Sequence, residues 1–347
     1  MTKKLQLAFC AGLMMFASLP SPAQVRPPGD SRVIAPVPSP GFPEGIATRG
    51  NRFYVSGPAA FGITDPSTVW AYDIGTGALE AAFPITIHNP AIPFRGLSCI
   101  AFGPDGKLYA IEPFVGVIRM NLDPANTQQL YAPFPPPPST GALPNDLAFD
   151  GDGNLYVTDS FQGLIYKIPP GGGAPLVWFQ DARLLGHPAI PIGVNGIRID
   201  KNDKNVFVTV TARSSDLAGV VYRLPLTPSP SAADLQEFHV YPFSAFGPEG
   251  PDGIAFGKSG YLYVALAGSS RISVLRPDGT EAVRYLGPAD NPGGSLNPIP
   301  WANPANIAFN DQAGTLLVTN HASLVTFDPR LFVVFDVFVS DKGQPLP

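Results

Sequence analysis

The chain has 347 residues, a formal charge of −5 and no run of basic residues, so neither nucleic acid nor an anionic membrane is an expected partner. It contains 42 Pro, 36 Gly and only 14 % charged residues, and it has no sustained 3.6-residue apolar period. This composition disfavours a helical protein and favours one large all-β domain or two smaller ones.

The first segment has the composition of a secretory signal peptide. Two lysines precede an apolar run from Leu5 to Leu19, and small residues lie at the two positions that a signal peptidase inspects. We therefore assign residues 1–23 to a signal peptide and residues 24–40 to an N-terminal extension. Losing the two lysines takes the formal charge from −5 to about −7. The mature protein is expected to be secreted or periplasmic.

Two kinds of chemistry are excluded by missing residues. Cys10 leaves with the signal peptide, which leaves Cys99 alone and rules out an intrachain disulfide or a thiolate metal site. The nucleophile elbow of serine hydrolases, Gly-x-Ser-x-Gly, does not occur in the chain.

One unit occurs six times between residues 41 and 347. It has an apolar-x-apolar segment, a polar hairpin turn, and a second apolar run that ends in small or polar residues. The copies are PEGIATRGNRFYVSG (43–57), LSCIAFGPDGKLYAIE (97–112), PNDLAFDGDGNLYVTDS (144–160), VNGIRIDKNDKNVFVTVT (194–211), PDGIAFGKSGYLYVALA (251–267) and PANIAFNDQAGTLLVTN (304–320). After each core come two more strand candidates, for example residues 163–168 and 174–179.

The spacing of these copies fits one blade of a β-propeller. Equivalent positions before the first strand are occupied by Glu44, Ser98, Asn145, Asn195, Asp252 and Ala305, which are separated by 54, 47, 50, 57 and 53 residues. Four strands repeated six times predict an all-β, six-bladed β-propeller over residues 41–347. A β-sandwich is the rival fold, but it requires no equal spacing. Residues 331–339 are expected in an outer strand of the sixth blade, alone or with residues near 32–36.

Register distinguishes two Pro-Asp-Gly sequences. Asp105 lies between the first and second strands of its blade, which predicts a hairpin turn. Asp252 instead precedes a first strand. First strands line the central channel of a propeller, so the six equivalent positions form a ring around its axis.

The ring predicts a metal site. Its oxygen-bearing members are Glu44, Asn145, Asn195 and Asp252, and carboxylate and amide oxygens are the ligands that a hard divalent cation such as Ca²⁺ prefers. Two carboxylates balance one dication, and the remaining coordination positions are open to water or substrate. The two Asn and the Asp are also ordinary turn residues, whereas Glu is a poor turn former.

These residues resemble those of the senescence marker protein/gluconolactonase family, which includes regucalcin and the sugar lactonases. Diisopropyl fluorophosphatase and the paraoxonases share the design. The resemblance implies a metal held by Glu44 of the first blade, Asn145 and Asn195 of the third and fourth, and Asp252 of the fifth. Where regucalcin-type sugar lactonases commonly carry an Arg that grips the sugar, this chain has Leu143.

The expected activity is metal-dependent hydrolysis of a small-molecule lactone or ester. The metal polarises the carbonyl, and Asp252 is the candidate catalytic carboxylate that takes a proton from water or attacks directly. Asp146 is the candidate partner that orients the ligands. Further candidates near the pocket are Ser98, His187, Trp301 and His321. Apolar residues in the neighbouring loops predict an apolar mouth.

Two alternatives stay open from the sequence. A non-catalytic propeller could bind a peptide, glycan or small molecule and use calcium only to lock its blades, or a metal-dependent lyase could use the same scaffold. We expect a monomer in each case.

Overall fold

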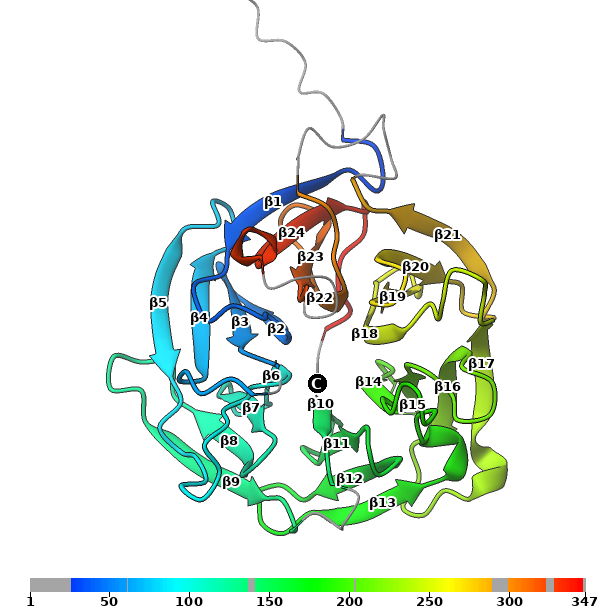
Figure 1. Cartoon of the computed structure of the whole chain (residues 1–347), viewed down its shortest axis with the longest axis horizontal. Coiled ribbons are helices and arrows are strands. Elements are labelled where there is room, and N and C mark those ends of the chain that lie inside the picture. The colour runs from blue at the N-terminus through cyan, green and yellow to red at the C-terminus, as the bar shows by residue number, and fades with distance from the viewer. Residues whose placement is uncertain are drawn as a thin grey trace, which may run out of the picture.

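The computed structural model describes residues 26–345 apart from residues 61, 137–140, 203, 289–298 and 323–327. The signal peptide assigned to residues 1–23 lies outside the described residues. Six four-stranded antiparallel sheets are arranged around a central axis (Figure 1). This arrangement confirms the predicted all-β, six-bladed β-propeller.

Each of the first five blades is continuous in the chain, with its first strand innermost. Blade one contains β2 (Ile46–Arg49), β3 (Arg52–Gly57), β4 (Thr68–Asp73) and β5 (Leu79–Pro84). Blade two contains β6 (Ile100–Phe102), β7 (Leu108–Glu112), β8 (Gly116–Met120) and β9 (Gln128–Pro133). Blade three contains β10 (Pro144–Phe149), β11 (Leu155–Asp159), β12 (Leu164–Ile168) and β13 (Leu176–Gln180). Blade four contains β14 (Val194–Ile199), β15 (Asn205–Val210), β16 (Gly219–Pro225) and β17 (Gln236–Tyr241). Blade five contains β18 (Pro251–Phe256), β19 (Leu262–Leu266), β20 (Arg271–Leu275) and β21 (Glu281–Leu286).

The sixth blade joins the two ends of the chain. It contains β22 (Pro304–Asn310), β23 (Thr315–Asn320), β24 (Val333–Phe338) and, outermost, β1 (Ser31–Pro36). Strand β1 pairs antiparallel with β24, with Ser31 opposite Val337. Residues 31–36, expected in an N-terminal extension, therefore belong to the propeller and close its ring.

Helical structure is limited to single turns in the described residues. These are η1 (Ala182–Leu184), η2 (Ala232–Asp234) and η3 (Pro329–Leu331), all of the 3₁₀ type. Within the same described ranges, we find no helix with the length and apolar character needed to cross a lipid bilayer.

The apolar core lies between neighbouring blades, because alternate residues of a strand face opposite sides of its sheet. In β3, Phe53 and Val55 pack toward the sixth blade, whereas Tyr54 packs toward the second. The repeated apolar runs of the sequence are these two-sided strands. Asp105 forms the predicted turn between β6 and β7, where its carboxylate accepts a hydrogen bond from the Lys107 backbone at 3.1 Å.

Hydroxyl groups on the second strands clip the inner strands of neighbouring blades together. Thr209 Oγ1 accepts from the Gly196 backbone N–H at 2.8 Å and donates to the Asp252 carbonyl of the next blade at 2.8 Å. Equivalent clips are made by Ser56, Thr158 and Thr319. The second blade has Ile111 at this position, and there the Cys99 N–H donates directly to the Asn145 carbonyl at 3.1 Å. These clips hold the ring residues in register.

Candidate metal centre

The predicted ring residues lie where the chain enters the inner strands. Asn145, Asn195 and Asp252 are the second residues of β10, β14 and β18, and Glu44 lies two residues before β2. The side chains of Glu44, Asn145 and Asn195 are buried, and that of Asp252 is partly buried. Ala305, the ring residue of the sixth blade, adds no polar group.

The carboxylates of the ring lie close enough to repel one another. Burial, followed by the negative charge of Asp146, raises the pKa of Glu44 to about 8. Burial and the charges of Glu44 and Asp146 raise the pKa of Asp252 well above its ordinary value, against a smaller opposing effect of a hydrogen bond from Asn195. The fold thus brings acids from the first, third and fifth blades close enough for their charges to interact.

The two ring amides are oriented by hydroxyl groups at the ends of their second strands. Ser160 Oγ donates to the Val194 carbonyl at 2.7 Å, so it accepts from Asn145 Nδ2 at 3.3 Å. Thr211 Oγ1 donates to the Pro251 carbonyl and accepts from Asn195 Nδ2, both at 3.0 Å. Because each NH₂ group is committed to a hydroxyl, the orientation of both amide groups is set.

The residues present fit a divalent cation. Among the described residues, Asn195 Oδ1 is buried and accepts no hydrogen bond. In the same part of the chain, no Lys or Arg forms an ion pair with Glu44 or Asp252. Two carboxylates without a counter-charge and a free amide oxygen are the donors that Ca²⁺ takes. No three His, Cys, Asp or Glu side chains of the described residues form a metal-binding group, so a cation at this place would also need the amide oxygens of Asn145 and Asn195.

His321 lies beside this ring. Its Nδ1 is 3.7 Å from Glu44 Oε2, and its Nε2 is 2.7 Å from the Ala59 carbonyl. A carbonyl only accepts, so Nε2 carries the proton and Nδ1 presents its lone pair to Glu44. Burial lowers the pKa of His321 to about 4, so the imidazole of His321 is neutral at pH 7.

Three other predicted pocket residues have different surroundings. Ser98 is buried and donates to the Pro144 carbonyl at 3.2 Å, which joins the second and third blades. His187 lies in the loop before β14, where its Nδ1 accepts from the Ala189 N–H at 3.1 Å. Trp301 is a core residue: it packs against Phe335 and donates from Nε1 to Ser31 Oγ at 3.0 Å. It therefore holds β1 against the sixth blade rather than lining a substrate pocket.

A second polar layer, of which only Asp146 was expected, lies next to the ring. Asp146 Oδ2 accepts from Arg198 Nη1 at 2.8 Å and from the Ile197 N–H at 3.1 Å. Asn306 Oδ1 accepts from Arg198 Nη2 at 3.4 Å, and Asn306 Nδ2 donates to Cys99 Sγ at 3.0 Å. A signal was present in the sequence, because Arg198 takes the place that alanine occupies in every other repeat.

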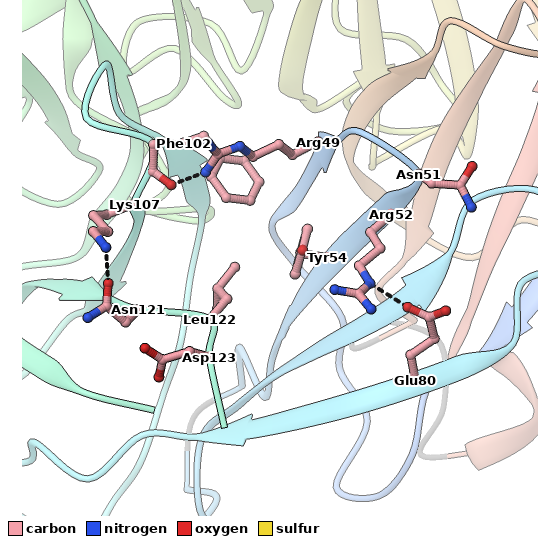
Figure 2. Close-up of a pocket in the computed structure, with 11 residues that line it drawn as sticks. Arg49, Asn51, Arg52, Tyr54, Glu80, Phe102, Lys107, Asn121, Leu122 and Asp123 are labelled. Carbon is pink, nitrogen blue, oxygen red and sulfur yellow. Dashed lines mark hydrogen bonds and ion pairs between the residues drawn. The ribbon is translucent and has the colours of Figure 1, made fainter. Parts of the chain in front are cut away.

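A cavity of about 550 Å³ lies between the first and second blades (Figure 2). It is lined by residues at hairpin turns, which are remote from the strand starts that carry the ring. Figure 2 shows that its cationic side chains are engaged within the cavity wall. The partners are Glu80 for Arg52, Asn121 for Lys107, and the ring of Phe102 together with the Gly106 carbonyl for Arg49.

Comparison with known proteins gives a family match. Residues 59–296 match the family model described as "SMP-30/Gluconolactonase/LRE-like region". This range contains Asn145, Asn195 and Asp252, whereas Glu44 lies before it. The chain is 26% identical over 275 residues to the protein named lactonase drp35 of Staphylococcus haemolyticus, which covers 73% of this chain and 77% of that one.

Solved structures with low sequence identity share the fold. The calcium-binding protein regucalcin from Agrobacterium tumefaciens superposes with a TM-score of 0.63 at 17% identity, covering 94% of this chain and 98% of that one. A streptogramin B lyase has a TM-score of 0.54 at 13% identity, with 88% and 96% covered. At these identities the likeness concerns the propeller alone.

Proposed function

Because the chain belongs to the SMP-30/gluconolactonase/LRE-like family, we propose that it is a metal-dependent lactonase with Ca²⁺ at the propeller axis. One observation carries this proposal: Glu44, Asn145, Asn195 and Asp252 occupy equivalent positions where the chain enters the inner strands, and neither carboxylate pairs with a Lys or Arg among the described residues. The name lactonase drp35 of the staphylococcal relatives supports the reaction, and the calcium-binding relative supports the metal.

We assign the following roles to residues of this chain. When bound, Ca²⁺ supplies Lewis-acid polarisation of the substrate carbonyl. Glu44, Asn145, Asn195 and Asp252 would hold the cation through oxygen atoms that the blades position. Asp252 would also accept a proton from the attacking water at a carboxylate oxygen, or attack the carbonyl carbon itself, in which case the ester oxygen leaves and water then hydrolyses the acyl intermediate. Asp146 and its hydrogen bonds keep β10 and β14 in place beside the ring.

Apolar side chains at the ring end favour a substrate with an apolar part. Among the described residues, the loops that enter the inner strands carry the exposed large apolar side chains of Phe94, Leu185, Phe243 and Phe246. In addition, Leu143 stands two residues before Asn145, where it offers no charge to a polyol. We therefore favour alkyl-substituted lactones or aryl esters over a sugar lactone. We also propose that residues 1–23 direct the protein to the periplasm or outside the cell.

Hydrolysis of a substrate panel tests the function. The panel contains γ- and δ-lactones with alkyl chains, gluconolactone and phenyl acetate, each with EDTA and with added Ca²⁺. We expect hydrolysis of the apolar substrates that EDTA abolishes and Ca²⁺ restores. Product mass separates hydrolysis, which adds one water, from elimination by a lyase.

Substitution of two ring acids tests the site. Glu44→Gln and Asp252→Asn should each reduce kcat/KM by at least about 100-fold and remove the stabilisation by Ca²⁺ seen as a shift in Tm. Asp105→Asn is the matched control, because it changes the same residue type in the same Pro-Asp-Gly sequence at a hairpin turn. Full activity in EDTA or in Asp252→Asn would refute the proposal, and calcium binding without hydrolysis would favour a binding module.

A further inference from the structure

One position of the inner strands distinguishes the fourth blade from the other five. Three residues after the ring position, five blades carry alanine and the fourth carries Arg198. The alanines are Ala47, Ala101, Ala148, Ala255 and Ala308. A single long cationic side chain is therefore available next to the axis.

Contacts of Arg198 show that its guanidinium group lies across the channel. It donates to Asp146 of the third blade at 2.8 Å and to Asn306 of the sixth blade at 3.4 Å. The inner strands of these two blades, β10 and β22, face each other across the axis (Figure 1). The side chain of Arg198 is 15% exposed and that of Asp146 only 1%. Arg198 thus connects the third and sixth blades through the residues that follow the ring positions Asn145 and Ala305.

Burial makes the net charge of this centre important, because charges in a poorly solvated place are weakly screened. The centre contains three carboxylates: those of Glu44 and Asp252 in the ring, and that of Asp146, which is the residue after the ring position Asn145. Among the described residues, Arg198 is the one Lys or Arg paired with any of the three. With all carboxylates ionised, three negative charges and one positive charge leave a net charge of −2, which matches one dication.

We propose that Arg198 is a positioning residue that neutralises Asp146 and thereby makes the centre selective for divalent over trivalent cations. This inference rests on the proposed metal centre and names a property of it. Without the guanidinium group, the net charge becomes −3 and favours a trivalent ion. One charge at roughly 10 Å from the cation, in a medium with a dielectric constant of about 20, changes the ratio of the trivalent-ion affinity to the divalent-ion affinity by about tenfold.

The test compares Tb³⁺ and Ca²⁺ binding, measured by terbium luminescence and by calorimetry. Arg198→Met should raise the Tb³⁺ affinity relative to the Ca²⁺ affinity by about tenfold. Adding Asp146→Asn to Arg198→Met should return the ratio to within about threefold of the wild-type value, since the net charge is again −2. Arg198→Lys should keep the wild-type ratio. Arg223→Met, a loss of the same charge on the outer part of the same blade, is the control.

Several results would overturn the proposal. An unchanged ratio in folded Arg198→Met, or a double variant that keeps the altered ratio, would show that Arg198 does not set the selectivity. If Arg198→Met does not fold, the proposal requires that the double variant and Arg198→Lys both fold and both show the wild-type affinity ratio. A different ratio in either of them would overturn it. A wild-type chain that binds neither ion would refute the metal centre and this inference together, whereas normal binding with an unchanged ratio would refute only the role of Arg198.

Discussion

At the scale of single residues, Glu112, which lies outside the candidate metal centre, should make the stability of the fold depend on pH. Its side chain is buried, and burial raises its pKa to about 7 despite a hydrogen bond from the Phe114 N–H at 3.1 Å. The unfolded chain releases this proton near pH 4.5, so between pH 4.5 and 7 the folded state binds more protons. Stability therefore falls as the pH rises through this window. Glu112→Gln should be more stable than wild type at pH 8 by roughly 1–3 kcal/mol, but not below pH 4.5.

Urea unfolding at pH 4.5 and pH 8 measures this difference. Gln can still accept the hydrogen bond from Phe114, so the comparison isolates the charge. Glu80→Gln is the control, because Glu80 is exposed and pairs with Arg52 at the surface. A stability difference between Glu112→Gln and wild type that is the same at both pH values would contradict the assignment.

At the scale of elements, the inner strands depend on the hydroxyl clips between blades. Thr209→Val keeps the shape of the side chain but leaves the Gly196 N–H without its hydroxyl acceptor and removes a donor to the Asp252 carbonyl. We expect a loss of about 1–3 kcal/mol in the free energy of unfolding, measured by chemical denaturation. Thr209→Ser keeps the hydroxyl and should be close to wild type. Equal stability of the Val and Ser variants would argue against the clip.

The close contact between β14 and β18 also explains why position 196 is a glycine. A Cβ atom on Gly196 would lie 2.4 Å from the Asp252 carbonyl oxygen, so β14 and β18 approach each other more closely than any side chain permits. The ring positions Asn195 and Asp252 are adjacent for this reason. The position of one strand therefore sets that of the next around the ring.

At the scale of the whole molecule, closure of the ring depends on β1. Residues 26–36 contact the rest of the sixth blade through the pairing of β1 with β24, the ion pair between Arg26 and Asp336, and the hydrogen bond from Trp301 to Ser31. A chain that begins at residue 38 should lose all of these and expose the edge of β24. We expect a Tm at least roughly 10 °C lower, measured by calorimetry. A chain that begins at residue 26 is the control, and equal Tm values for the two would contradict closure by β1.

The sequence by itself determined the number of blades and the equivalence of the ring positions. Six units at near-equal spacing favour a closed ring over the rival sandwich, and register alone separated the turn residue Asp105 from Asp252. That Glu44, Asn145, Asn195 and Asp252 hold a metal stays a prediction, although the fold brings their side chains to one axis.

Only the tertiary structure decided which strand closes the propeller and which side chains pair next to the ring positions. The partners of β1 are some 300 residues away in the chain, and no local pattern names them. Trp301 resembled a pocket residue in sequence and became a core residue because β1 covers it. The pairing of Arg198 with Asp146 and Asn306 arose because blade closure places three separate repeats around a channel narrow enough for one side chain to cross. Repetition along the chain specifies a strand and its neighbours, whereas contacts across the axis exist only once all blades have closed.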